Sequence, residues 1–255
     1  MVFIHALFLF VASIIGSTCN SVAGGGTFFT VPALIFTGIA PTVANATSTV
    51  ALWPGNISSA VAYRHELVQV DRKVLLLLTI VSLLGSILGA FLLLTTPQAT
   101  FLFLLPYLVF GATCLFALSD LLNRRLKKPL EKVVLTRRKL GWVMAGQFLV
   151  SIYCGYFGGG GSIMMLALLV MIGLPSIHVI NALKTFLSAS ISGVSVLIFA
   201  VAGIIVWPQG LLMVVGAIIG GYGGAHFARK VPARWIRLCI ILVGLTLTVY
   251  FLIYK

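Results

Sequence analysis

The chain has 255 residues, of which 60% are hydrophobic and only 8% are charged, and its mean hydropathy is +1.17. A water-soluble domain cannot bury that much apolar surface, so the composition excludes one. The formal net charge of +13 invites a nucleic-acid-binding function, which we reject because the basic residues crowd into a few loops between apolar runs.

Apolar runs long enough to cross a bilayer are expected at eight places, since about 20 helical residues span a hydrocarbon core of about 30 Å. These ranges are 2–19, 43–63, 73–95, 99–121, 140–157, 177–202, 209–228 and 234–254. Two shorter apolar segments, 27–39 and 162–173, are marginal for a full crossing. The first run lacks the basic start of a signal peptide and is kept as structure. The sequence predicts an all-α polytopic membrane protein with eight long transmembrane helices and two short or broken helices.

Each short segment follows a cluster of glycines, and the two clusters lie in matching surroundings 135 residues apart. The first cluster ends Gly24-Gly25-Gly26-Thr27 and the second ends Gly159-Gly160-Gly161-Ser162. Asn45-Ala46 recurs as Asn181-Ala182, and Gly85-x-x-x-Gly89-Ala90 recurs as Gly220-x-x-x-Gly224-Ala225. We therefore expect two transmembrane repeats, 1–122 and 140–255, joined by a basic linker, 123–139. Paired, glycine-broken helices in two repeats are typical of transporters.

The basic residues predict how the chain is oriented in the membrane. Eight of the 17 Lys and Arg residues lie in or beside the linker: Arg124, Arg125, Lys127, Lys128, Lys132, Arg137, Arg138 and Lys139. Two more basic loops lie at 64–73 and 229–237, whereas the connections at 96–98 and 203–208 carry no charge. The positive-inside rule places the basic loops in the cytoplasm. Each repeat then makes five crossings if its short segment reverses the chain, so we expect inverted repeats with both termini outside.

The glycine clusters predict an anion site. A helix that begins inside a bilayer leaves backbone N–H groups that must face protein or water. Thr27 and Ser162 each place a hydroxyl at an expected N-cap, where free N–H groups and the helix dipole attract anions. We expect the two helix starts to converge near the midplane, with substrate bound by Gly24, Gly25, Gly26, Thr27, Gly159, Gly160, Gly161 and Ser162. The alternative is that the glycines only allow close packing or turns.

The long helix after each short segment carries polar residues on one face, at three- or four-residue spacing. They are Asn45, Ser48, Thr49, Asn56 and Ser59 in the first repeat, and Asn181, Thr185, Ser188, Ser192 and Ser195 in the second. From these stripes we predict that Asn45, Thr49, Asn181 and Thr185 bind substrate. Hydrogen bonding between helices is the alternative.

Lys184 is the most informative single residue. It lies eight residues after Ser176, about 12 Å into the helix at about 1.5 Å per residue, near mid-bilayer depth. A lysine at that depth costs about 2.5–3.5 kcal/mol on insertion scales, and no Asp or Glu is near it in the sequence. We predict that its partner is the transported anion, with snorkelling to the interface as the alternative. Ser48 takes its place in the first repeat, so the site would be asymmetric.

The sequence offers no catalytic or metal-binding motif. Its four cysteines and four histidines show no CxxC or HExxH spacing, so we predict no enzyme activity, metal or cofactor. Cys19 and Cys154 lie beside the two glycine clusters, which leaves open a membrane-embedded sulfur redox component. A non-transporting scaffold that docks partners through the basic linker is the other alternative.

The glycine clusters, Pro41 with Asn45-Ala46-Thr47-Ser48, and Asn181-Ala182 together resemble the TauE/SafE family of sulfite exporters over nearly all of the chain. The resemblance implies a permease in the cytoplasmic (inner) membrane for a small sulfur-containing anion of the sulfite or organosulfonate type. Its partners would be that anion and the lipid bilayer, and the repeats suggest alternating access around a midplane site. The second repeat departs from the first by having Leu183-Lys184 where the first has Thr47-Ser48.

Overall fold

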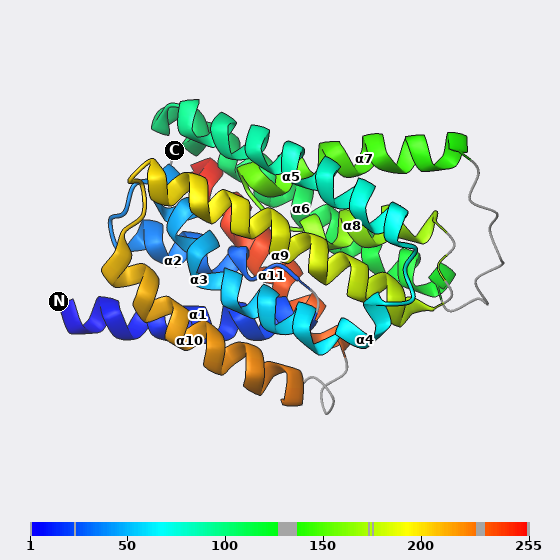
Figure 1. Ribbon diagram of the computed structural model, residues 1–255. Coiled ribbons are helices and arrows are strands. Elements are labelled where there is room, and N and C mark those ends of the chain that lie inside the picture. The colour runs from blue at the N-terminus through cyan, green and yellow to red at the C-terminus, as the bar shows by residue number, and fades with distance from the viewer. Residues whose placement is uncertain are drawn as a thin grey trace.

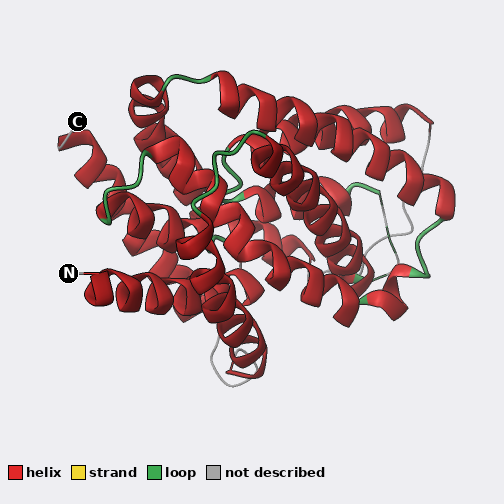
Figure 2. Ribbon diagram, turned by 60° about the vertical axis from the view of Figure 1, so that its left-hand side comes forward, coloured by secondary structure: helices red, strands yellow, loops and turns green. Residues whose placement is uncertain are grey.

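The computed structural model describes residues 2–22, 24–126, 137–172, 174, 176–227 and 233–253, which form eleven helices and no strand (Figures 1 and 2). This confirms the all-α class. In the first half of the chain the helices are α1 (Val2–Val22), α2 (Thr27–Phe36), α3 (Pro41–Ala62), α4 (Arg64–Leu67), α5 (Arg72–Thr95) and α6 (Gln98–Leu126). In the second half they are α7 (Arg137–Tyr156), α8 (Gly161–Val170), α9 (Ile177–Val201), α10 (Trp207–Phe227) and α11 (Ala233–Ile253).

Every apolar range expected from the sequence coincides with a helix, and α4 is a single added turn in a connection. Among the described residues, four helices are long and apolar enough to cross a membrane: Phe3–Asn20, Arg72–Thr95, Gln98–Leu118 and Ile177–Val201. Large apolar side chains such as Leu76, Leu84 and Phe91 of α5 are exposed, and a bilayer is the environment that covers such a surface. The chain is a multi-pass membrane protein.

The helices pair in the same way in both halves of the chain. When the single-turn α4 is not counted, the first helix of each half packs on the fourth helix of the other, as α1 does on α10 and α7 on α5. The pairs α3–α9 and α6–α11 join helices that hold the same place in the two halves. The main contacts therefore stay the same when the two halves are exchanged.

Helices α3 and α9 cross antiparallel near the centre of the molecule (Figure 1). Near the start of α3, the Thr47 hydroxyl accepts a hydrogen bond from the backbone N–H of Val206, which follows α9, at 3.1 Å. Midway, the Trp53 indole N–H donates to the carbonyl of Ala189 at 3.1 Å. Beyond the end of α3, α4 contacts α9. Two helices that share a place in the sequence pattern thus run in opposite directions.

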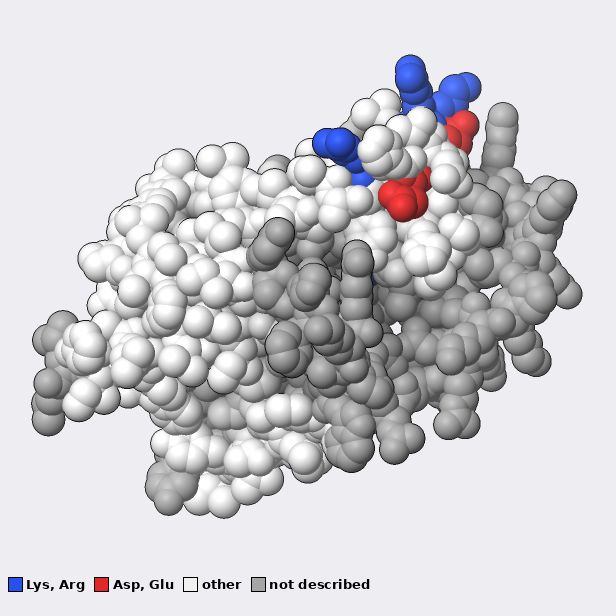
Figure 3. All heavy atoms as spheres, turned by 90° about the horizontal axis from the view of Figure 1, so that it is seen from below, with Lys and Arg blue, Asp and Glu red and all other residues white. Residues whose placement is uncertain are grey.

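The described basic residues outside the core lie at one end of the molecule. Arg64 begins α4, Arg72 begins α5, and Arg138 lies at the start of α7. Figure 3 shows the charged side chains of one face gathered at one end, and Figure 1 shows both chain termini at the opposite end. Residues 127–136 of the predicted linker and 228–232 of the third basic loop lie outside the described residues.

Glycine allows α5 and α7 to pack at close range, and this gives a stability prediction. A methyl group at Gly89 would overlap the backbone carbonyl oxygen of Ile152, whereas one at Gly111 in α6 would meet nothing within 4 Å. We expect Gly89→Ala to destabilise the protein by about 1–3 kcal/mol through overpacking, and Gly111→Ala to be neutral or stabilising by up to about 1 kcal/mol. The measurement is the midpoint of heat-induced loss of the monodisperse peak in detergent. Equal midpoints for both variants would contradict the packing account.

Candidate functional site

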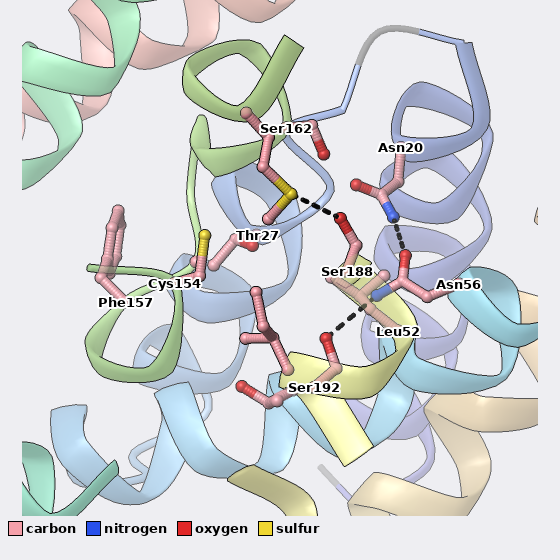
Figure 4. A pocket seen from close by; sticks show the side chains of 13 residues that line it. Asn20, Thr27, Leu52, Asn56, Cys154, Phe157, Ser162, Ser188 and Ser192 are labelled. Atoms are coloured by element: carbon pink, nitrogen blue, oxygen red, sulfur yellow. Dashed lines mark hydrogen bonds between the residues drawn. The ribbon is translucent and has the colours of Figure 1, made fainter. Parts of the chain in front are cut away.

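A polar cavity lies among the end of α1, the starts of α2 and α8, and the facing sides of α3 and α9 (Figure 4). We call the part beside Cys154, Met165 and Ser192 the inner part and the part beside Tyr63, Asn181 and Lys184 the outer part. Asn20, Asn56, Ser162 and Ser188 line both. The two parts have cavity volumes of about 60 Å³ and 100 Å³, well below the roughly 300–1,000 Å³ of sites for drug-sized ligands, so they suit only a small ligand. The site residues of the two halves of the chain are brought together here.

The two glycine clusters bring the starts of α2 and α8 to this one cavity. Thr27 of α2 and Ser162 of α8 both line its inner part. A methyl group at Gly24 would lie 3.0 Å from Cβ of Ser162, so the clusters are in close contact. Gly24 and Gly160 have φ angles of 82° and 78°, a region that glycine adopts without strain. The turns that aim both helices at the cavity depend on these glycines.

The prediction of hydroxyl N-caps is wrong. The N-cap residues are Gly26 for α2 and Gly160 for α8, and neither helix has a side-chain cap. The chain enters both helices through a glycine, so Thr27 and Ser162 lie inside the first turn of α2 and α8. Among the described residues, the backbone N–H groups of Thr27 and Ser162 have no recorded hydrogen-bond partner. The helix starts therefore keep free donors at the cavity, more than a capped helix would.

Lys184 extends from α9 into the outer part of the cavity. Asn181, Thr185 and Ser188 of the same helix line this part with it, opposite Ser162. Of the described lining residues of both parts, Lys184 is the only one with a formal charge. Within the described chain its ammonium group has no recorded hydrogen bond or ion pair. An unpaired cation beside free N–H groups forms a site for an anion.

A chain of hydrogen bonds that the sequence analysis missed joins the first glycine cluster to the other half of the protein. The backbone N–H of Gly26 donates to Oδ1 of Asn20 at 3.5 Å. The Asn20 amide donates to Oδ1 of Asn56, and the Asn56 amide donates to the Ser192 hydroxyl, each at 3.1 Å (Figure 4). Asn56 and Ser192 belong to the predicted polar stripes, but Asn20 gave no signal beyond being an amide at the end of an apolar run.

The structure separates the predicted residues Asn45 and Asn181, although each begins an Asn-Ala pair. Asn181 lines the cavity, whereas Asn45 is buried away from it and donates to the carbonyl of Tyr156 at 2.8 Å. Thr49 and Thr185 both line the cavity. The described lining includes Gly158 but none of the six predicted glycines, namely Gly24, Gly25, Gly26, Gly159, Gly160 and Gly161.

The two cysteines of the redox hypothesis lie in different hydrophobic clusters. Cys19 is buried with Phe28 and Phe116, whereas Cys154 lines the inner cavity beside Met165. Both are free thiols. Among the described residues, no three His, Cys, Asp or Glu side chains are grouped so as to hold a metal ion. The cavity offers hydrogen-bond donors and one cation.

Comparison with known proteins is consistent with a transport site. The profile of the family described as "Sulfite exporter TauE/SafE" matches residues 8–251. A "Probable membrane transporter protein" of Haemophilus influenzae is 28% identical over 246 residues, which cover 94% of this chain and 91% of the relative. The "Probable membrane transporter protein YfcA" of Escherichia coli K12 is 28% identical over 241 residues, covering 92% and 85%. No solved structure matches the chain significantly.

Proposed function

Because the chain belongs to the TauE/SafE family of sulfite exporters, we propose that it is a permease for a small sulfur-containing anion, of the sulfite or organosulfonate type, in the cytoplasmic membrane. Its relatives are named as membrane transporters, not enzymes. The observation that carries the proposal is the cavity in which Lys184 shares one part with Ser162 at the start of α8, while Thr27 at the start of α2 lines the adjoining part. The membrane environment and a small-molecule substrate follow from the family. The negative charge proposed for the substrate follows from the donors and the cation of the cavity.

The proposed binding site uses three kinds of donor. The Lys184 ammonium supplies the charge, and charge-assisted hydrogen bonds are roughly twice as strong as neutral ones. The N–H groups at Thr27 and Ser162 add the positive ends of two helix dipoles. Asn181, Thr185 and Thr49 complete the lining. The glycines of both clusters hold the two helix starts in place, and Asn45 acts indirectly through its bond to the carbonyl of Tyr156.

The proposed topology has eight long membrane-spanning helices and two short ones, in inverted repeats 1–122 and 140–255 around the linker 123–139. The antiparallel course of α3 and α9 and the symmetric helix pairing support inversion. The basic residues at one end support a cytoplasmic position for that end. Transport then proceeds by alternating access around the central cavity. An inside-negative potential favours exit of an anion by about 2.3 kcal/mol per charge at 100 mV, so export needs no coupled ion.

The direct test is sulfite efflux from proteoliposomes that contain the purified protein. We expect flux well above that of protein-free vesicles, and competition by a short alkylsulfonate. Folded protein that moves neither anion would contradict the proposed function.

The same assay separates transport from sulfur redox chemistry. We expect the double variant Cys19→Ser, Cys154→Ser to keep at least about half of the flux, because neither thiol is needed as an anion donor. Loss of all flux in a variant with unchanged thermal stability would favour the redox hypothesis instead.

A further inference from the structure

At the crossing of α3 and α9, two residues of α3 bond to their own counterparts in the other repeat. The Trp53–Ala189 and Asn56–Ser192 hydrogen bonds each link residues 136 positions apart, the same offset that relates Asn45 to Asn181. The crossing is tight, since a methyl group at Gly193 would lie 3.2 Å from the Trp53 indole nitrogen. Contacts between equivalent residues lie on the axis that relates the two repeats.

On either side of this crossing the two repeats differ. Toward the end of α3 and the start of α9, the side chains of Tyr63, Asn181 and Lys184 line the cavity. Their counterparts on the other side are Phe199, Asn45 and Ser48, which are 0%, 1% and 1% exposed. Only one half-site is therefore open among the described residues, and it lies toward the end of α3 that leads to Arg64 and α4.

The sealed side is closed by specific polar contacts. The hydroxyls of Ser48 and Thr30 are 2.6 Å apart, and the Asn45 amide bonds to the carbonyl of Tyr156 at 2.8 Å. The Thr47 hydroxyl accepts from the N–H of Val206 at 3.1 Å. The Asn45–Tyr156 and Thr47–Val206 bonds join the two repeats. In the other half-site, Lys184 stands where Ser48 stands here and has no such bond among the described residues.

We propose that the α3–α9 crossing at Trp53, Asn56, Ala189 and Ser192 is the fixed axis of the transport cycle, and that the contacts of Asn45 and Thr47 form a gate that is closed in this structure. The inference rests on the proposed alternating-access function. If the two repeats exchange conformations, contacts between equivalent residues map onto themselves and persist. The bonds of Asn45 and Thr47 join non-equivalent residues and have no recorded counterpart on the Lys184 side of the described chain, where Leu183 stands in place of Thr47, so they must break. The structure is then the state open toward the basic end.

Cysteine cross-linking tests the axis against the gate, in a background with Cys19, Cys114, Cys154 and Cys239 replaced by serine. The axis pair is Trp53→Cys with Ala189→Cys, residues of the crossing that do not line the described cavity, and the gate pair is Thr47→Cys with Val206→Cys. Each pair is bridged with a short bifunctional thiol reagent, and its sulfite flux is compared with that of its own reduced form. We expect the bridged axis pair to keep at least half of its flux. The bridged gate pair should fall to the protein-free background and recover on reduction.

Flux that stops in the bridged axis pair, or continues unchanged in the bridged gate pair, would overturn the proposal. Should the reduced axis pair itself be inactive, the gate pair and the following measurement decide the proposal. A second measurement needs no transport: the rate at which a single cysteine reacts with a membrane-impermeant maleimide. We expect Asn181→Cys to react at least ten times faster than Asn45→Cys, and equal rates would contradict a closed gate. If the cysteine-free parent carries no sulfite, the proposed function fails, while the labelling rates still show which half-site is open.

Discussion

Replacing Lys184 with methionine should reduce sulfite flux in proteoliposomes by about 10- to 100-fold. Methionine keeps the length and apolar stem of lysine but removes the only formal charge of the described cavity lining. A hydrogen bond to a charged group contributes about 1.5–3 kcal/mol, and each 1.4 kcal/mol corresponds to about a tenfold change in affinity. The loss should appear mainly as a raised half-saturation concentration for the anion.

The matched control is Lys139→Met, which removes a lysine from the exposed start of α7. It should leave flux within about twofold of the parent, because surface charges outside a site contribute little. Lys184→Arg keeps the charge but replaces a compact ammonium with a larger planar group, so we expect partial flux. Full flux in Lys184→Met, with anion affinity unchanged, would remove Lys184 from the site.

The second large effect is expected for Gly24→Ala, which alters the point where the two glycine clusters meet. Gly24 has a φ of 82°, and its new methyl group would lie 3.0 Å from Cβ of Ser162. A non-glycine residue in this region costs about 1–2 kcal/mol, and pressing Ser162 out of place disturbs the start of α8 as well. We expect flux to fall at least tenfold and the thermal midpoint in detergent to drop.

Gly38→Ala separates backbone strain from the clash between the clusters. Gly38 has a similar φ of 88°, yet a methyl group there would meet nothing within 4 Å. This variant should lose comparable stability but retain most of its flux. Similar flux losses in both variants would show that strain alone, not the convergence of the two helix starts, explains the effect of Gly24→Ala.

The positions of the helices could be predicted because membrane hydropathy is a local property of the sequence. Runs such as 73–95 and 177–202 need no tertiary contact to be recognised, and they coincide with α5 and α9. The matching glycine clusters likewise predicted that the two short helices contribute to one site. The meeting of Gly24 with Ser162 agrees with the expected convergence of the two helix starts.

The details of the cavity could not be predicted, because they depend on contacts between distant parts of the chain. Asn20, Asn56 and Ser192 form one hydrogen-bonded chain, although 36 and 136 positions separate the bonded pairs. The N-caps were mispredicted because glycines with positive φ, Gly24 and Gly25 before α2 and Gly160 before α8, turn the chain into each helix without a hydroxyl cap. Asn45 and Asn181 both begin an Asn-Ala pair but lie in a sealed and an open half-site, a difference that depends on contacts with distant residues such as Tyr156.

The most direct test of the anion site is the position of bound selenite, a heavier analogue of sulfite, in crystals of the purified protein. The anomalous signal of selenium locates the anion without reference to any transport assay. Our account predicts one strong peak within hydrogen-bond distance of the Lys184 ammonium and the Ser162 backbone N–H, and its loss in Lys184→Met. Ordered selenite found only outside this cavity, with the space around Lys184 and Ser162 filled by water, would contradict it.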